Sequence, residues 1–368
     1  MMAEIAGEVV YGGVDTHAGV HVAAAADRAG RVLGTGSFPA TPEGYAGLLG
    51  WLRGHGTLAA AGVEGTGSYG AGLARYLAGQ GVTVLEVNRP GRQRRRRYGK
   101  SDPADAVSAA LAAVHGQDCA VPKARDGAAE SLRALMAARR GAVKARTQAA
   151  GQLAGLAVTA PDPLRARLHG LRQGRLAAAC TALPGPGAAG ETGMTDVTDV
   201  TDVTDATVMA LASIGRRWQD LDGEITRLDA AITAIVRRSA PDLLALPGVG
   251  PLSAAALITA AGDNPERITT PDAFAALCGT SPVDCSSGRQ QRHRLNRGGD
   301  RQANSALWRI AHTRLRCDPR TQDYLAARTA GGKTRKEVIR SLKRYIAREI
   351  WKILCRPATP APARDLAA

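Results

Sequence analysis

Short apolar runs separated by turn residues fill the N-terminal part of the chain. Residues 9–27 hold two such runs joined by a turn, and residues 31–38 hold a third. Two more runs, at 58–64 and 82–88, are bounded by glycine and typical of buried strands, and a helical pattern at 69–80 connects them. Three strands followed by a strand–helix–strand unit predict a mixed α/β sheet.

A helical pattern replaces the strands from about residue 126 onward. Residues 126–152 are rich in Ala, Arg and Leu, and residues 207–239 carry apolar side chains at every third or fourth position. The second stretch has the seam of a coiled coil, which would pair with another helix or another subunit. Further helices are predicted at 304–316 and 337–354.

A low-complexity segment separates the two long helical stretches. Residues 184–206 are rich in Pro and Gly and then repeat Thr-Asp-Val, which is typical of a flexible surface insert. We therefore expect four parts. They are an α/β domain at 1–124, a helical coiled-coil region at 125–240 that contains the insert, a mainly α-helical domain at 241–356, and a disordered tail at 357–368.

Composition and charge indicate a folded protein that binds a polyanion. Of the 368 residues, 45% are apolar and 22% are charged, which excludes a wholly disordered chain. The net charge is +15, and residues 286–356 hold 19 Lys and Arg against 5 Asp and Glu, so nucleic acid is the first candidate partner. The six cysteines form no Cys-x-x-Cys pair, and no apolar run is long enough to span a membrane. With no signal peptide predicted, we expect a cytoplasmic protein.

Four carboxylates lie in positions suited to metal binding. Asp15 follows one apolar run and Glu64 ends another, while Asp102 and Asp105 are spaced to share one face of a helix. Such a set could bind one or two Mg²⁺ ions, which prefer oxygen ligands and promote phosphodiester chemistry. Alternatively, Asp102 caps a helix that starts with Pro103, Asp105 stabilises its first turn, and the other two acids lie in turns.

Two further segments are candidates for phosphate binding. A run of four arginines, usually a solvated surface, could hold phosphate groups by counterion release beside a metal site; it consists of Arg94, Arg95, Arg96 and Arg97. The segment LPGVGP, with Gly248 and Gly250, predicts a helix–hairpin–helix element whose backbone N–H groups can bind a phosphate. The alternative for this segment is a tight turn between two packed helices.

A candidate nucleophile precedes an arginine-rich stretch. Ser286 and Ser287 stand before Gly288, and a serine among guanidinium groups could attack a phosphodiester while those groups stabilise the developing charge. The sequence shows no residue that must act as its base, and Ser-Ser-Gly is also a common surface loop. The arginines that follow are Arg289, Arg292, Arg294, Arg297 and Arg301.

These motifs, taken in order, resemble one family. GVDTH, VEGTGSYG, GKSDPADA, LPGVGP and GTSPVDCSSG…RGGDRQANSALW are similar to the DEDD transposases of the insertion-sequence one-ten family and to the Piv-type DNA invertases. The resemblance covers almost the whole chain. It implies a RuvC-like N-terminal domain with an RNase-H fold, a coiled-coil middle region, and a C-terminal transposase domain that carries an essential serine.

The resemblance also implies roles for individual residues and partners. It places a metal-binding tetrad on Asp15, Glu64, Asp102 and Asp105, and a nucleophile on Ser287, with Ser286 beside it as the alternative. Members of the family are understood to act as oligomers in which the acidic site of one subunit meets the serine of another. Some are guided by a structured bridge RNA that pairs with target and donor DNA.

We therefore expect a transposase or site-specific recombinase of an insertion sequence. It would exchange DNA strands with Mg²⁺ through a covalent phosphoserine intermediate, bind double-stranded DNA and a guide RNA, and act as a dimer or tetramer. Two other functions stay open. A metal-only nuclease would cleave DNA with an activated water and would not need the serine, whereas a non-catalytic nucleic-acid-binding protein would need neither site.

Overall fold

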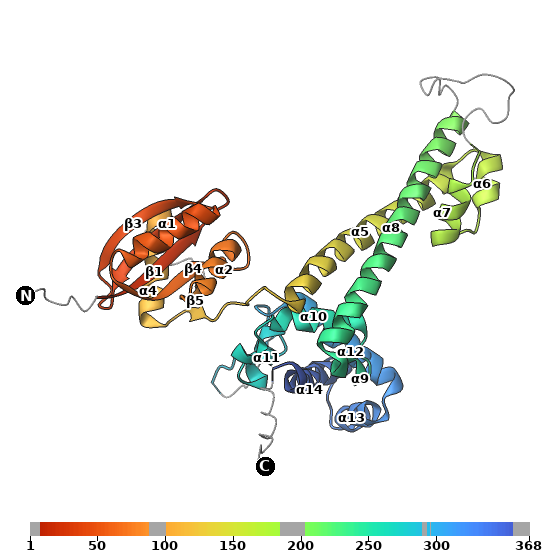
Figure 1. Cartoon of the computed structure of the whole chain (residues 1–368). Coiled ribbons are helices and arrows are strands. Elements are labelled where there is room, and N and C mark those ends of the chain that lie inside the picture. Colours follow the sequence, from red (N-terminus) through yellow and green to blue (C-terminus); the bar gives the residue numbers. More distant parts are fainter. Residues whose placement is uncertain (1–7, 88–100, 185–202, 289–292, 295, 356–368) are drawn as a thin grey trace, which may run out of the picture. The chain divides into compact units, whose positions relative to one another are not determined.

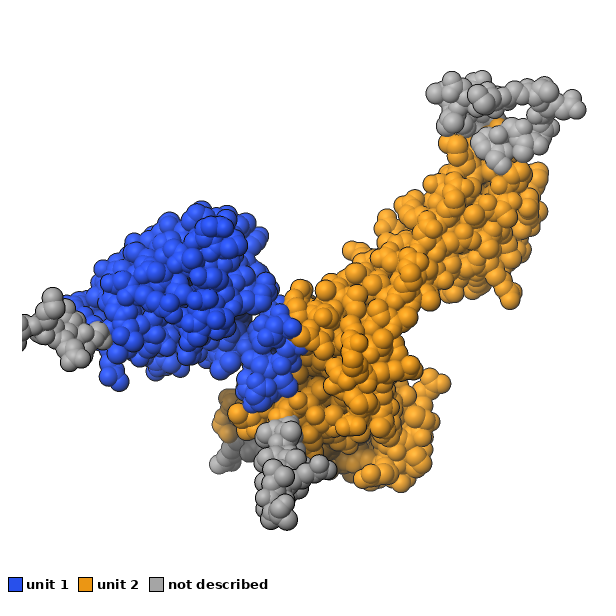
Figure 2. Space-filling model, in the orientation of Figure 1, with its two compact units in different colours: residues 1–126, 262–267 blue, residues 127–261, 268–368 orange. Residues whose placement is uncertain are grey.

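The computed structural model describes residues 8–87, 101–184, 203–288, 293–294 and 296–355. The chain forms two compact units, which Figure 2 distinguishes by colour. The first unit comprises residues 1–126 and 262–267, and the second comprises 127–261 and 268–368. The first is a mixed α/β domain and the second is mainly helical, which confirms the predicted succession of fold classes.

A six-stranded mixed sheet forms the centre of the first unit (Figure 1). Its strand order is β3-β2-β1-β4-β5-β6, with β1, β2 and β3 antiparallel to one another in turn and with β1, β4 and β5 parallel. The short β6 is antiparallel to β5. The strands are β1 (Val9–Thr16), β2 (Val20–Asp27), β3 (Val32–Pro39), β4 (Thr57–Glu64), β5 (Thr83–Val87) and β6 (Cys119–Ala120).

Helices cover both faces of this sheet. They are α1 (Pro42–Arg53), α2 (Ala71–Gly79) and α4 (Asp102–His115). Alternate residues of β2 face opposite ways: Ala23 and Ala25 pack with the leucines of α1 and α2, whereas Ala24 and Ala26 pack with α4. Because both faces are covered, the central strands are apolar along their length, which explains why their runs are recognisable in the sequence.

The contact between α4 and the sheet is unusually close because glycine faces the helix on both strands below it. A Cβ on Gly13 of β1 would lie 2.0 Å from the backbone N of Ala110 and 2.3 Å from the carbonyl O of Ala106. A Cβ on Gly62 of β4 would lie 2.5 Å from the carbonyl O of Ala109. Helix backbone therefore rests directly on strand backbone, and no side chain separates them.

Two long helices, α5 (Ala128–Thr159) and α8 (Val203–Ser239), pair along their length in the second unit (Figure 1). Arg139 pairs with Asp229 and Arg146 with Asp222, so the helices run antiparallel. The predicted coiled-coil seam of residues 207–239 thus has a partner within its own chain. Two short helices, α6 (Asp162–Leu168) and α7 (Gln173–Thr181), pack at one end of the pair.

The remaining helices share one large core at the other end of this pair. Leu132 of α5, Ile232 of α8 and Leu257 of α10 contribute to it, and each is fully buried. The helices that complete it are α9 (Pro241–Ala245), α10 (Pro251–Ala261), α11 (Pro271–Leu277), α12 (Arg301–Cys317), α13 (Pro319–Ala330) and α14 (Arg335–Leu354). A two-stranded ribbon of β7 (Val283–Asp284) and β8 (His293–Arg294) lies between α11 and α12 in the sequence.

Several predicted elements agree with the structure and others do not. The five strands β1 to β5 and the helices α12 and α14 are confirmed to within a few residues. The predicted insert at 184–206 extends too far, because residues 203–206 form the first turn of α8; residues 185–202 lie outside the described part, as does the tail at 357–368. The sequence pattern does not predict the helices α6, α7 and α13. Within the described residues, no helix is long and apolar enough to cross a membrane.

The close contact of α4 with the sheet predicts that one methyl group added at Gly13 destabilises the first unit. Gly13→Ala should lower the stability of the first unit by about 2–3 kcal/mol, because the new Cβ meets backbone that cannot move aside without displacing α4. The matched control is Gly50→Ala, at an exposed position of α1 with open space around it, which should be neutral or stabilising by ~0.5–1 kcal/mol. Thermal unfolding of both variants measures the difference; equal midpoints would contradict the packing described here.

Candidate active site

Two acidic residues lie at the carboxyl ends of neighbouring parallel strands. Asp15 is 7% exposed near the end of β1, and Glu64 is 8% exposed as the last residue of β4. Val14 pairs with Val63 in the register of these strands, so the two acids occupy the next position on each. The hydroxyl of Thr16 donates a 2.8 Å hydrogen bond to the carbonyl O of Glu64, which holds the two strand ends together.

The first turn of α4 provides the other two predicted acids. Ser101 occupies the N-cap, so Asp102 is the first helical residue and the interpretation of Asp102 as the cap is wrong. Its carboxylate is half exposed and contacts His17 instead. Asp105 is half-buried one turn further along. The close packing of α4 on Gly13 fixes how far this turn stands from β1.

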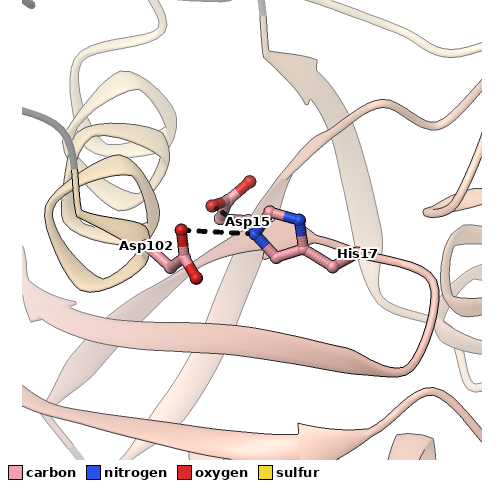
Figure 3. A group of neighbouring side chains, drawn as sticks. All are labelled: Asp15, His17 and Asp102. Carbon is pink, nitrogen blue, oxygen red and sulfur yellow. Dashed lines mark hydrogen bonds and ion pairs between the residues drawn. The ribbon is translucent and has the colours of Figure 1, made fainter.

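The side chains of Asp15, His17 and Asp102, here called the metal cluster, converge on one point (Figure 3). The Nε2 atom of His17 lies 3.2 Å from Oδ2 of Asp15 and 3.4 Å from Oδ1 of Asp102. One potential ligand atom from each residue lies within 4.8 Å of the other two. Sequence reasoning missed His17, although it ends the GVDTH motif that carries Asp15.

The electrostatics of the metal cluster favour a cation. Burial raises the pKa of Asp15, and the nearby carboxylates of Asp105 and Asp102 raise it further, whereas His17 opposes the shift. The raised pKa of Asp15 means that its ionised form is disfavoured, because the carboxylate is buried and lies near two others. A divalent cation between the carboxylates would remove this repulsion.

The donor set is consistent with a divalent metal ion. Carboxylate oxygens are the ligands preferred by Mg²⁺ and Mn²⁺, and the imidazole of His17 is an additional donor more typical of transition metals. Of the four predicted ligands, the structure brings Asp15 and Asp102 together in the cluster. Asp105 lies near enough to affect Asp15, and Glu64 occupies the adjacent strand end outside the three-residue cluster.

The predicted nucleophile lies in the second unit, in residues 285–288 after β7, here called the serine loop. The backbone N–H and the hydroxyl of Ser286 both donate to Oδ1 of Asp284, at 2.8 and 2.5 Å. These hydrogen bonds, with a smaller effect of His293, lower the pKa of Asp284. Ser287 is exposed, and its hydroxyl forms no hydrogen bond with a described residue. Sequence reasoning missed Asp284, which stands two residues before the serine pair.

The predicted phosphate-binding arginines fall into two groups. Arg94, Arg95, Arg96, Arg97, Arg289 and Arg292 lie outside the described residues. Arg294 on β8, Arg297 after it and Arg301 at the start of α12 are all exposed on the second unit.

The two hairpin glycines have different surroundings. Gly248 adopts a φ of +74°, and a Cβ there would lie 3.2 Å from the carbonyl O of Ile310, so this turn packs closely on α12. Arg314 of α12 also donates to the carbonyl O of Pro247 at 2.9 Å. Gly250 is exposed with open space around it, directly before α10. Packing on α12 accounts for the first glycine, while the backbone at the second is open to solvent.

Two family models match separate parts of the chain. A family model for IS110-type DEDD transposases, described as "Transposase", matches residues 12–159, and a model described as "Transposase IS116/IS110/IS902 family" matches residues 240–326. The chain belongs to the IS110 family of transposases. The first matched range contains all four acids, and the second contains the hairpin and the serine loop.

Two curated proteins are similar to parts of this chain. One is a "Probable family 20 transposase" from Pseudomonas aeruginosa, 33% identical over 150 residues, which is 39% of this chain and 44% of that protein. The other is an insertion element IS110 uncharacterized 43.6 kDa protein from Streptomyces coelicolor, 32% identical over 120 residues, or 32% of this chain and 29% of that protein. The matched segments therefore span less than half of each relative.

The raised pKa of Asp15 predicts opposite effects of one substitution on stability and on metal binding. A folded-state pKa above the unfolded value means that the ionised carboxylate costs stability as the pH rises through the folded pKa. At pH 7 without metal, Asp15→Asn should therefore raise the unfolding midpoint by about 2–4 °C. It should also abolish any increase in midpoint caused by MgCl₂ or MnCl₂.

Asp27, at the end of β2, is the matched control for this substitution. Hydrogen bonds from the backbone of Arg31 and Ala29 lower the pKa of Asp27, so its ionised form stabilises the fold above the unfolded pKa. Asp27→Asn should lower the midpoint at pH 7 and leave the metal response unchanged. The same metal response in Asp15→Asn as in the parent chain would contradict the assignment of Asp15 as a ligand.

Proposed function

We propose that this IS110-family transposase is a metal-dependent DNA recombinase that cuts and joins strands through a covalent phosphoserine link at Ser287. The observation that carries the proposal is the convergence of Asp15 and Asp102, from separate segments, on one point at the carboxyl end of β1. The strand order of the sheet, with three antiparallel strands followed by two parallel ones, supports a RuvC-like, RNase-H-type domain.

The acids of the first unit would hold Mg²⁺. Asp15 and Asp102 would supply two of the oxygen ligands, and Glu64 and Asp105 would supply the others from the next strand end and the next helical turn. When bound, one or two Mg²⁺ ions supply Lewis-acid stabilisation of the charge that develops on a phosphodiester. His17, between the two central carboxylates, orients both through its Nε2 atom.

Ser287 would supply the nucleophile. Its Oγ forms a bond to phosphorus, the DNA phosphorus–oxygen bond breaks, and the released strand end takes up a proton to become a hydroxyl. The hydroxyl of a second strand end then attacks the phosphoserine, which forms a new phosphodiester and returns the proton to the serine. One bond forms for each that breaks, so joining needs no external energy source.

The choice between the two serines follows from their hydrogen bonds. Ser286 holds Asp284 with both its backbone N–H and its hydroxyl, so its Oγ is committed to shaping the turn. Ser287 presents a hydroxyl without a partner among the described residues, on the exposed side of the loop. Arg294, Arg297 and Arg301 follow this loop and would bind the phosphates around it.

The proposed partners are a second copy of the chain, DNA and a guide RNA. The acids and the serine lie in different compact units, which supports a homo-oligomer in which the metal cluster of one subunit serves the serine loop of another. Donor and target DNA are the substrates of this reaction. A structured guide RNA is the proposed source of sequence choice, and the bacterial cytoplasm is the proposed location.

A metal-only nuclease is the competing function. It is favoured by one observation, namely that the metal cluster is complete within the first unit without any residue of the second. In that case a water molecule attacks the phosphate, cleavage is hydrolytic, and no protein–DNA bond forms.

A covalent adduct on a denaturing gel separates these two functions. The protein is expressed with its native flanking DNA, so that any guide RNA is present, and is incubated with labelled DNA and Mg²⁺. The parent chain should form an adduct, and Ser287→Ala should reduce it below detection because no other hydroxyl is proposed to attack. Ser286→Ala is the matched control and should retain most of the adduct, since it keeps the hydroxyl of Ser287, which has no partner among the described residues.

The other outcomes decide against the proposal in distinct ways. Cleaved DNA without adduct in the parent chain indicates the metal-only nuclease. An adduct that survives Ser287→Ala but is lost in Ser286→Ala assigns the nucleophile to the other serine. Asp102→Ala should abolish both cleavage and adduct in either case, because both functions need the metal cluster.

A further inference from the structure

A basic hollow of about 190 Å³ lies beside the ribbon of the second unit. Its walls are the loop after α11, the strand β8, and one face of α14. Five of its lining side chains are basic or imidazole groups, and none of the residues that line it is acidic. The five are His293, Arg294, Arg340, Lys343 and Arg344.

Lys343 is the least expected member of this hollow. It is 6% exposed, and its Nζ donates a 2.9 Å hydrogen bond to Oδ1 of Asn304, a neutral group. Burial lowers its pKa, and Arg340 adds to the shift. No carboxylate pairs with it among the described residues. A buried ammonium group has three donors and is costly without a counter-charge, so this site favours an anion.

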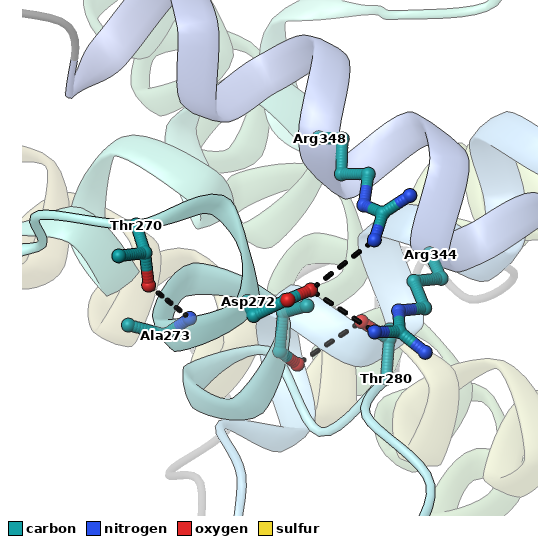
Figure 4. Close-up of polar contacts among 7 residues, drawn as sticks. Thr270, Asp272, Ala273, Thr280, Arg344 and Arg348 are labelled. Atoms are coloured by element: carbon teal, nitrogen blue, oxygen red, sulfur yellow. Dashed lines mark hydrogen bonds and ion pairs between the residues drawn. The ribbon is translucent and has the colours of Figure 1, made fainter.

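Two other cations of α14, unlike Lys343, pair with a carboxylate. Arg344 and Arg348 both contact Oδ1 of Asp272, at 3.0 and 3.4 Å (Figure 4). These hydrogen bonds lower the pKa of Asp272. The fold therefore neutralises two guanidinium groups of this helix with a carboxylate of α11 and leaves Lys343 and Arg340, on the side of the hollow, without an ion pair in the described part of the chain.

A second hollow of about 410 Å³ adjoins the first and contains an exposed aromatic ring. Trp308 of α12 is 47% exposed, and the ring of His312 lies 4.0 Å from it, one turn further along the helix. Arg297 and Arg301 line the same hollow. Asn296 lines both hollows, so the two are neighbours on the surface of the second unit. We call the surface formed by these two neighbouring hollows the strand groove.

We propose that the strand groove binds an unpaired nucleotide strand, with a phosphate held by Lys343 and Arg340 and a base stacked on Trp308. An exposed aromatic ring in a positively charged groove is one arrangement by which proteins bind single strands, since every base has a face that can stack. In a duplex those faces are covered by neighbouring bases. The groove therefore selects unpaired nucleotides over double-stranded ones.

This inference rests on the proposed function, because strand exchange separates the two strands of a duplex and leaves unpaired nucleotides near the serine loop. The groove shares Arg294 and Arg297 with the segment that follows that loop. Unpaired DNA and unpaired RNA offer the same phosphates and bases. The groove is thus suited to a displaced DNA strand or to a loop of a guide RNA, and the experiment separates these sources.

The test is binding of fluorescein-labelled (dT)₁₂ and (U)₁₂ by the whole chain, measured by fluorescence anisotropy over a range of salt concentrations. Trp308→Leu should weaken binding of the preferred oligonucleotide by about 5-fold to 100-fold, the usual effect of removing one stacking platform. Lys343→Met should weaken it at low salt and reduce the slope of log K against log salt by about one, as expected for one lost phosphate contact.

Matched controls on the same chain exclude general effects. Tyr69→Leu removes an aromatic side chain that is 61% exposed in the first unit, and Lys352→Met removes an exposed cation of α14 outside the groove. Both should bind like the parent chain. Circular dichroism verifies that Lys343→Met is folded; Lys343→Arg, which keeps the charge, should keep the salt slope.

The measured affinities identify the bound strand and decide whether the groove binds unpaired nucleotides. Tighter binding of (dT)₁₂ assigns the groove to DNA, and tighter binding of (U)₁₂ assigns it to RNA; both support the proposal. An unchanged Kd in Trp308→Leu, or a blunt duplex of the same length that binds as tightly as either single strand, overturns it. Ser287→Ala should bind these oligonucleotides normally, so a failure of the serine mechanism is distinguishable from a failure of the groove.

Discussion

The direct contact between α4 and the sheet is the constraint on which the acidic site depends. Gly13 and Gly62 remove the side chains that would separate helix from strand, and the alanines of α4 present backbone to them. The helix therefore stands at one fixed height above β1. That height brings Asp102 within reach of His17 and Asp15, so the site arises from packing that involves no charged group.

Charge is divided between the two units in a way that suits phosphate chemistry. The first unit crowds carboxylates at a buried strand end, which repels a phosphate until a cation is bound. The second unit presents cations along the ribbon, α12 and α14, which attract nucleic acid without a cofactor. Among the described residues, the metal cluster lies in the first unit and the basic hollows lie in the second, so the proposed reaction requires both units.

Sequence patterns predict the elements here better than they predict the contacts between them. The strands β1 and β4 are visible because both of their faces are buried, whereas α13 is largely polar and buries little, so no period marks it. Asp15 and Asp102 were predicted from their motifs. His17, Lys343 and Trp308 were not, because their significance depends on tertiary neighbours: two carboxylates, a neutral asparagine and an open hollow.

Anomalous diffraction from crystals of the whole chain grown with Mn²⁺ tests the central claim most directly. Mn²⁺ accepts the oxygen ligands that Mg²⁺ uses and scatters anomalously, so its position is measured independently of any assumption about ligands. The packing of α4 predicts a peak about 2.1 Å from a carboxylate oxygen of Asp15 and from one of Asp102. A peak bound by neither residue, with α4 still seated on Gly13, would contradict the assignment of this site as the catalytic metal centre.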